Sequence, residues 1–225
     1  RRPVTRRLVP DEPGIGSFGA GRSGRAVARL ARAAGYQVVI AGPRPEHTAR
    51  ALAQTVPGVT TSGVAELPQR AGLLVLAVPL HRFRELPLPL LGGHIVVDMM
   101  NYWPDVDGSL PEFEGAVKPS SVLVAEALPP TARVVKALNH LSHRQIQQLA
   151  RPVGAPDRAA LGICGDHPTA VQSVADVVDR IGFDPVAAGD LGASAALQPG
   201  AAVFGAALDA AAMRRLLAAD QFSAA

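Results

Sequence analysis

Gly19-Ala20-Gly21-Arg22-Ser23-Gly24 is the stretch that decides the fold of this chain. A short apolar run, residues 15–18, precedes it, and a helical pattern, residues 24–34, follows it. A glycine-rich turn between a strand and a helix brings backbone N–H groups and the positive helix end up to a phosphate. Gly35 then provides a stop for the helix. This context, more than the glycine spacing itself, predicts a dinucleotide-binding turn.

Strand and helix patterns alternate along the whole chain. Short apolar runs occur at residues 15–18, 36–41, 58–61, 72–78, 94–98, 132–136, 158–164 and 184–188. Helical patterns occur at residues 24–34, 46–55, 120–128, 168–181 and 206–219. Residues 73–78 are apolar without alternation, which is typical of strands covered on both faces. We therefore predict an α/β fold, a Rossmann-type doubly wound and mostly parallel sheet with a small C-terminal α/β extension.

The end of the second predicted strand bears on the choice of dinucleotide. NAD-binding chains usually place an acidic residue there, whose carboxylate binds the ribose hydroxyls. Here the sequence reads Gly42-Pro43-Arg44, and a guanidinium binds a phosphate bidentately. We predict NADP(H) as cofactor, with Arg44 on the 2′-phosphate, Gly42 making room for it and Arg22 reaching the same side. The alternative is that Arg44 is an ordinary solvated loop charge.

Ligands of such folds lie outside the carboxyl ends of the strands, where polar and aromatic residues gather in this sequence. His81 and His140 are each either a proton donor or substrate hydrogen-bonder, or an ordinary turn histidine. Tyr102 and Trp103 either stack on a second planar cofactor or cover a sheet edge. The catalytic residues stay unassigned, and the nearest candidates are His140, Asn139, Asn101 and Tyr102. The predicted cofactor contacts are Gly19, Ala20, Gly21, Arg22, Ser23, Gly24, Gly42, Arg44, Val78, Pro79, His81 and Asn101.

Composition and charge exclude several classes of function. The net charge of +3 owes +4 to the first ten residues, so the rest of the chain is slightly acidic. This distribution argues against a nucleic-acid partner. A single cysteine excludes intramolecular disulfides and a cysteine metal cluster, and no metal site is predicted. No apolar run approaches 18 residues, so we expect no membrane span and a cytoplasmic protein.

Six segments of the chain resemble the NADP oxidoreductases that depend on coenzyme F420. They are GAGRSG at 19–24, VIAGPRP at 39–45, LAVPLHRFRELP at 76–87, VVDMMNYWP at 96–104, ARVVKALNHL at 132–141 and ALQPGAAVFG at 196–205. Ser17 and the pair Gly42-Pro43 depart from the pattern of the family. The resemblance implies hydride transfer between NADPH and the deazaflavin of coenzyme F420 as a small-molecule co-substrate. It also implies that Pro79, His81, Asn101, Tyr102, Asn139 and His140 lie near the two reacting rings.

The chain is expected to divide into a flexible leader at residues 1–13, an NADP-binding Rossmann domain at 14–139 and a smaller α/β extension at 140–225. Hydroxyacid dehydrogenases and pyrroline-5-carboxylate reductases look similar in their N-terminal halves. Their long, all-helical second domain is not matched here, because residues 140–225 contain two strand patterns. An NADP-binding redox sensor without turnover, or a reductase of flavin or another small substrate, stays open. The apolar helix predicted at 206–219 packs on the sheet or forms the face of a homodimer.

Overall fold

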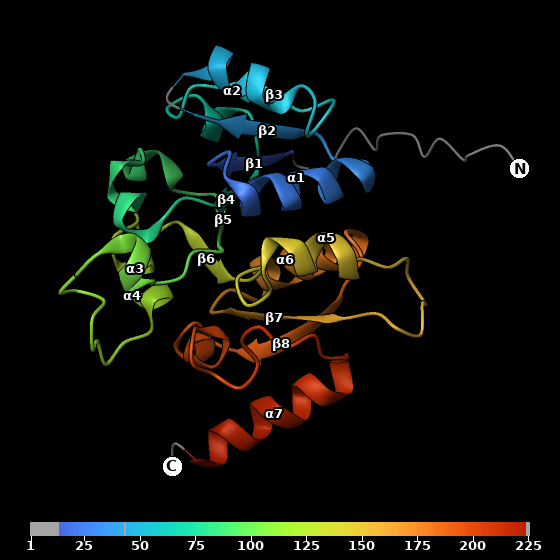
Figure 1. The fold of residues 1–225 in the computed structure, drawn as a ribbon. Helices are drawn as coiled ribbons and strands as arrows, with labels where there is room; N and C mark the ends of the chain where they lie inside the picture. Colours follow the sequence, from blue (N-terminus) through green and yellow to red (C-terminus); the bar gives the residue numbers. More distant parts are fainter. Residues whose placement is uncertain (1–13, 43, 224–225) are drawn as a thin grey trace, which may run out of the picture.

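The computed structural model describes residues 14–42 and 44–223, so the predicted leader lies outside the described residues. Within the described chain, eight strands form one central sheet (Figure 1). The strands are β1 (Ile15–Phe18), β2 (Val38–Ala41), β3 (Thr60–Ser62), β4 (Leu73–Leu76), β5 (Ile95–Asp98), β6 (Arg133–Lys136), β7 (Ala160–Gly165) and β8 (Asp184–Gly189). They lie in the order β3-β2-β1-β4-β5-β6-β7-β8, in which β6–β7 is the antiparallel pairing, so β7 and β8 run opposite to the other six strands. The predicted Rossmann-type, mostly parallel sheet is confirmed.

The order of the strands places the ligand site. From β1 the chain crosses to β2 on one side, and later returns to β4 on the other side. The two crossovers leave a crevice at the carboxyl ends of β1 and β4, where doubly wound folds bind their ligands. The glycine-rich turn follows β1 directly, so it opens into this crevice.

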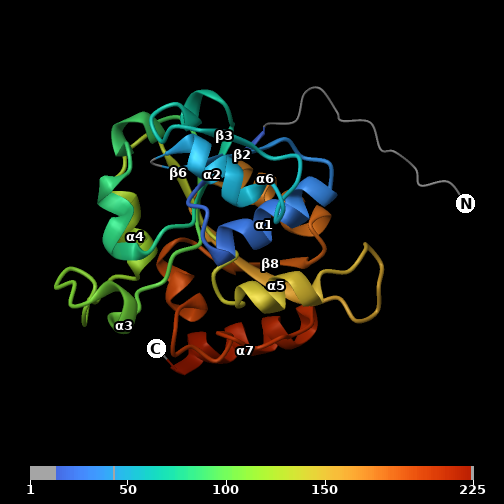
Figure 2. The same ribbon diagram turned by 45° about the horizontal axis from the view of Figure 1, so that its top comes forward.

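Helices cover both faces of the sheet. They are α1 (Arg22–Ala33), α2 (Pro45–Leu52), α3 (Pro104–Asp107), α4 (Ser120–Glu126), α5 (His143–Leu149), α6 (Pro168–Arg180) and α7 (Ala210–Ser223). Side chains of α1, α2, α5 and α6 share one hydrophobic cluster with the sheet, and α1 and α5 pack side by side (Figure 2). The opposite face is covered by α4 and by the 3₁₀-helices η1 (Leu67–Gln69), η2 (Leu80–Glu85) and η3 (Leu88–Leu91). This burial on both faces explains why the central strands read as continuous apolar runs.

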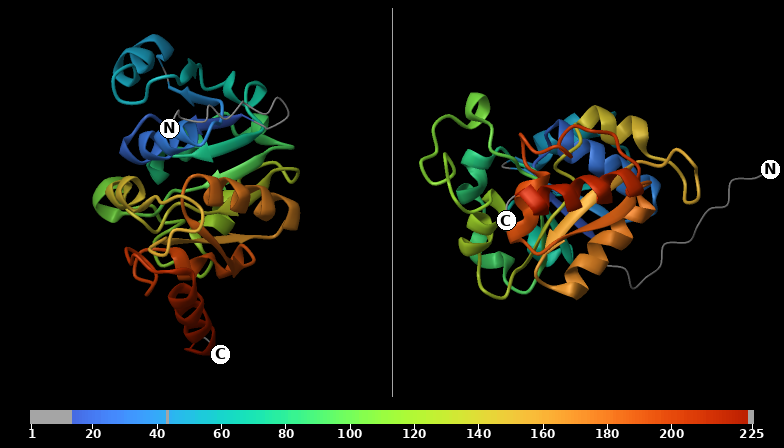
Figure 3. Two further views of the ribbon diagram at one scale, coloured as in Figure 1. Left: turned by 90° about the vertical axis from the view of Figure 1, so that its right-hand side faces the viewer. Right: turned by 90° about the horizontal axis from the view of Figure 1, so that it is seen from below.

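The C-terminal part of the chain extends the same sheet. Strands β7 and β8, the 3₁₀-helix η4 (Gly192–Leu197) and α7 enclose a separate hydrophobic cluster, and α7 packs along β8 (Figure 3). Helix α7 begins four residues later than the pattern at 206–219 predicted, and Met213 and Leu217 form its buried positions. Leu216 packs partly against the same cluster. The division of the chain at residue 140 stays a prediction.

A buried ion pair joins β5 and β6 at their carboxyl ends. Lys136 Nζ lies 3.2 Å from Asp98 Oδ2, and both side chains are almost fully buried. Ser121 donates to the same carboxylate at 2.7 Å, Met100 N donates to its other oxygen at 2.9 Å, and Lys136 also donates to Met100 O. Both charged groups thus have further hydrogen-bond partners, which buried charges require. The pair fixes the chain where β5 enters the candidate site.

Candidate functional site

The three motif glycines of the first turn have distinct physical reasons to be glycine. Gly19 has φ +110°, and a Cβ there would lie closer than 3.0 Å to the carbonyl oxygen of Ala77. A Cβ at Gly24 would lie 2.5 Å from the carbonyl oxygen of Gly19. A Cβ at Gly21, in contrast, would meet no protein atom within 4 Å. Gly19 and Gly24 therefore allow tight packing, while the space beside Gly21 is left open to a ligand.

The N-terminus of α1 is built to receive an anion. The helix begins at Arg22, earlier than the predicted start at residue 24, because Gly24 packs inside its first turn. Gly21 is the N-cap, no side chain caps the helix, and its first turn has no acidic residue. Arg25 Nε donates to Ala20 O at 2.6 Å and holds the turn in place. The first backbone N–H groups of α1 are consequently free to bind a diphosphate.

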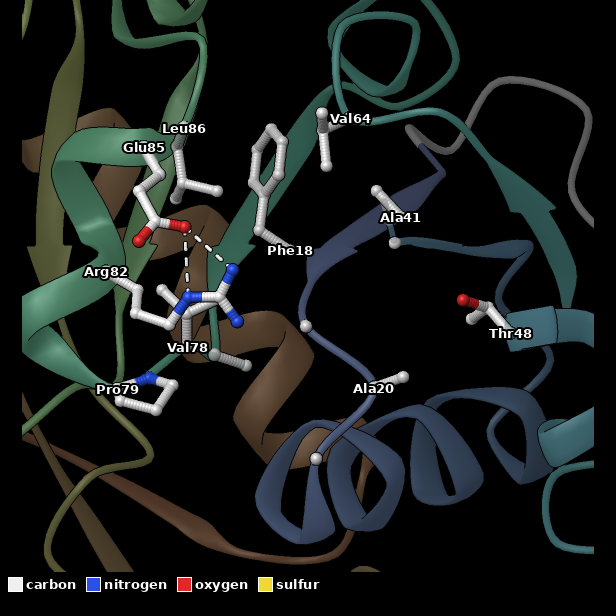
Figure 4. Close-up of a pocket in the computed structure, with 14 residues that line it drawn as sticks. Phe18, Ala20, Ala41, Thr48, Val64, Val78, Pro79, Arg82, Glu85 and Leu86 are labelled. Atoms are coloured by element: carbon white, nitrogen blue, oxygen red, sulfur yellow. Dashed lines mark hydrogen bonds and ion pairs between the residues drawn. The ribbon is translucent and has the colours of Figure 1, made fainter. Parts of the chain in front are cut away.

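Two adjoining cavities meet at this turn. The β2-side cavity, of about 300 Å³, is lined by Phe18, Gly19, Ala20, Gly21, Ala41, Gly42, Thr48, Val64, Ala77, Val78, Pro79, Arg82, Glu85 and Leu86 (Figure 4). The β5-side cavity, of about 470 Å³, is lined by Gly21, Arg22, Ser23, Ala77, Val78, Pro79, Met99, Met100, Asn101, Trp103, Val106, Asp107 and His143. Both share Gly21 and residues 77–79, so together they form one groove across the carboxyl ends of the strands.

At the end of the β2-side cavity next to α2, Gly42 makes room for a side chain of the protein itself. A Cβ at Gly42 would clash with Thr48 Oγ1, and this hydroxyl donates to Arg44 O at 3.1 Å. Glycine thus makes room for a threonine that itself lines the cavity. Arg44 is the exposed N-cap residue of α2, and its guanidinium makes no hydrogen bond with the described residues. Thr48 was not predicted, because its role depends on the angle at which α2 leaves the strand.

Asn101 and Asn139 come together at the β5-side cavity. Asn101 Nδ2 donates to Asn139 O at 2.9 Å, and Asn139 Nδ2 donates to Asn101 Oδ1 at 3.0 Å and to Leu197 O at 2.6 Å. Leu138 has φ +64°, the one positive φ of a non-glycine residue in the described chain. A strained backbone conformation of this kind persists only where surrounding contacts stabilise it, and here it directly precedes Asn139. The amide pair ties the loop after β5 to the C-terminal segment.

A buried carboxylate that the sequence analysis missed organises the same cavity. Asp107 Oδ1 accepts from His81 Nδ1 at 2.9 Å and from His81 N at 3.1 Å, while Oδ2 accepts from Trp103 N at 2.8 Å. Because a carboxylate only accepts, Nδ1 of His81 carries a hydrogen and Nε2 is the nitrogen left for other partners. Asp107 therefore joins the loops after β4 and β5, which wall the cavity on two sides.

Two of the predicted candidates point elsewhere. Tyr102 donates to Gly108 O at 3.0 Å, and its ring packs on Phe113 with the centroids 6.2 Å apart. Its neighbour Trp103 lines the β5-side cavity instead. His140 is fully buried, and its Nε2 accepts from Gly162 N at 3.1 Å. Burial lowers the pKa of His140 to about 4, so this histidine is a neutral part of the core.

Other chemistry finds little support within the part of the chain that the structure describes. No group of three or more His, Cys, Asp or Glu side chains there could hold a metal ion. Burial raises the pKa of the Cys164 thiol to about 12, which keeps this cysteine in its unreactive form. No helix in the described ranges has the length and apolar character needed to cross a membrane.

Comparison with known proteins agrees with this geometry. Residues 14–102 match the family described as NADP oxidoreductase, coenzyme F420-dependent. The match covers the first part of the described chain, from β1 to just past β5. The resemblance predicted from the six segments is thereby confirmed for the N-terminal ones. The protein YjhV of Escherichia coli (strain K12) is 44% identical over 48 residues, which span 21% of this chain and 35% of YjhV.

Solved structures share the fold over most of the chain. The hypothetical protein SMa0349 of Sinorhizobium meliloti has a TM-score of 0.72 and 27% identity, covering 87% of this chain and 94% of that one. A protein of Arthrobacter sp. FB24, provisionally named an F420-dependent NADP reductase, has a TM-score of 0.68 and 21% identity over 93% of both chains. A reductive aminase of Aspergillus terreus in complex with NADPH has a TM-score of 0.57 and 16% identity, covering 93% of this chain and 61% of that one. These structures show that the fold is shared, and the family that matches residues 14–102 is one of NADP oxidoreductases.

Proposed function

We propose that this protein transfers a hydride between NADPH and coenzyme F420 or a similar planar redox acceptor. The observation that carries the proposal is the continuity of the two cavities across Gly21 and residues 77–79. A dinucleotide laid over the glycine turn has its adenosine half in the β2-side cavity. Its nicotinamide then enters the β5-side cavity, where about 470 Å³ is open to it and to an acceptor.

The residues of the groove fit NADPH at three points. Gly21 leaves room for the diphosphate, and the free N–H groups at the start of α1 donate to it. Arg44, exposed at the N-cap of α2, supplies a guanidinium for the 2′-phosphate. We propose that Thr48 assists there, because its hydroxyl lines the cavity beside Arg44.

Bound NADPH supplies the hydride, and the chain has to align the two rings and exclude water. Trp103 is 43% exposed and borders the β5-side cavity, so it offers a flat apolar wall to a planar acceptor. Its ring is supported edge-on by Phe204, with the centroids 5.6 Å apart. Asn101, held by Asn139, supplies a fixed amide at the same cavity. No side chain is assigned as a nucleophile, in keeping with a reaction carried by the two cofactors.

The direct test is turnover. The purified protein is mixed with NADPH and oxidised F420, and the loss of deazaflavin absorbance is followed, with NADH in place of NADPH as control. The proposal expects NADPH-dependent loss of absorbance that Trp103→Ala slows through a raised KM for F420. Tight NADPH binding without turnover on F420, flavins or quinones would instead identify an NADP-binding sensor. Turnover on flavin alone would identify a flavin reductase.

The assembly is a separate proposal. Helix α7 packs one side on β8 through Met213 and Leu217, and we propose, as from the sequence, that the protein forms a homodimer. A light-scattering mass of the purified protein decides this directly. A mass near the 23.3 kDa of one chain would reject the dimer.

A further inference from the structure

An ion pair stands at the rim of the β2-side cavity, whose wall is otherwise mostly apolar. Of the described residues that line this cavity, Arg82 and Glu85 carry the charged side chains, and Thr48 is the further polar one. Figure 4 shows the Arg82 side chain reaching into the cavity opposite Phe18 and Val64, with Glu85 beside it. Neither charged residue was singled out from the sequence.

The pair holds the guanidinium in one orientation. Arg82 Nε and Nη2 both donate to Glu85 Oε2, at 3.0 and 2.7 Å, from positions three residues apart on η2. The hydrogen bond from Arg82 lowers the pKa of Glu85, so its carboxylate stays ionised. Oε1 of Glu85 and the flat face of the guanidinium remain available to a ligand. The side chains are 51% and 60% exposed, and such a pair contributes little to stability.

We propose that Arg82 and Glu85 recognise the adenine of the cofactor, the guanidinium stacking on the ring and the carboxylate accepting from the exocyclic amino group. A planar cation favours the face of an aromatic ring, and an ionised carboxylate accepts from an amino donor. The apolar lining beside the pair matches the faces and edges of a purine. This inference rests on the proposed NADPH binding. It adds side-chain contacts to the adenine ring beside the predicted phosphate contacts.

The chain offers a matched control. Arg84, two residues along on η2, makes the same kind of exposed ion pair with Glu112, at 2.5 and 3.1 Å, and does not line the cavity. Calorimetry is done with NADPH and with 2′,5′-ADP, which carries the adenosine half alone. Arg82→Ala is expected to weaken both ligands by the same factor, about tenfold, while Arg84→Ala leaves both unchanged. Equal thermal unfolding of the two variants confirms that both are folded.

The amino group is tested with deamino-NADPH, which has an oxygen in its place. Wild type is expected to prefer NADPH about tenfold, and Glu85→Ala to abolish that preference while Glu112→Ala keeps it. Two results would overturn the adenine contact alone. In the first, Arg82→Ala binds both ligands as tightly as Arg84→Ala does. In the second, Arg82→Ala loses affinity for NADPH but not for 2′,5′-ADP. Wild type that binds neither NADPH nor 2′,5′-ADP would overturn both the contact and the proposed function.

Discussion

Replacing Gly21 by alanine should separate cofactor binding from folding. The backbone of Gly21 has φ −69° and ψ −179°, which any residue adopts, and the added methyl meets no protein atom within 4 Å. Alanine loses less chain entropy on folding but is a poorer N-cap than glycine, and each effect is below about 1 kcal/mol. The free energy of unfolding should therefore stay within about 1 kcal/mol of wild type.

Binding should suffer far more than folding in this variant. The methyl group occupies the space where the diphosphate approaches the start of α1, so it displaces charge-assisted N–H bonds worth about 1.5–3 kcal/mol each. Loss of one such bond weakens NADPH binding by at least about tenfold in calorimetry. Gly24→Ala is the contrast, because its Cβ would lie 2.5 Å from the Gly19 carbonyl oxygen and destabilise the fold itself. NADPH affinity of Gly21→Ala within threefold of wild type would refute the assigned path of the diphosphate.

Four further predictions concern single side chains. Arg44→Ala should raise the Kd for NADPH about tenfold or more in calorimetry and leave that for NADH unchanged, whereas an unchanged preference removes Arg44 from the phosphate site. Asp107→Asn replaces one accepting oxygen by an amide NH₂. The kcat/KM with F420 should then fall about tenfold, while the Kd for NADPH stays unchanged. An equal loss of both would point to misfolding. Lys136→Met should lower the free energy of unfolding, measured in urea, by about 3–5 kcal/mol, because it leaves the buried Asp98 without its cation. The double variant with Asp98→Leu should recover part of this lost stability. His140, with its pKa lowered from 6.5 to about 4, binds protons more readily in the unfolded chain, so stability should fall by up to about 3 kcal/mol as the pH drops from about 6.5 to 4. His140→Gln should flatten that slope in urea titrations, and a slope equal to wild type would assign it to other groups.

The strands of the sheet were predictable because each one is marked by a short apolar run in its own sequence. Each predicted apolar run overlaps one observed strand, and the central strands, buried on both faces, need apolar side chains at nearly every position. The short helices α3 and α5 were missed. Helix α5 begins with a capping box between Ser142 and Gln145, a short signal that is visible in the sequence. Helix α3 has only four residues, Pro104–Asp107, so no periodicity could reveal it.

The candidate site was predictable mainly in its backbone part, although the predicted contacts Val78, Pro79 and Asn101 also line the cavities. The glycines of the first turn follow from steric requirements that the glycine spacing in the sequence already indicates. In the structure, Gly19 and Gly24 allow close packing, and Gly21 leaves open space. The side chains that shape the cavities depend on contacts between distant loops. Asp107 meets His81 across 26 residues, and Asn139 meets Leu197 across 58. Tyr102 and Trp103 are adjacent in sequence, yet only Trp103 lines the β5-side cavity, because their side chains leave the backbone in different directions.

On the proposed function, the choice of acceptor depends on residues that follow the family match. The family match ends at residue 102, shortly after β5, so it covers the whole glycine turn and the β2-side cavity. The far wall of the β5-side cavity is supported from beyond that point, by Asp107, by Asn139 held on Leu197 O, and by Phe204 against Trp103. Relatives that share the first part can differ in these supports without any change in how the dinucleotide is held. Substitutions in this support should shift the KM for the acceptor and leave the Kd for NADPH in place, and that split would show which residues choose the partner of the hydride.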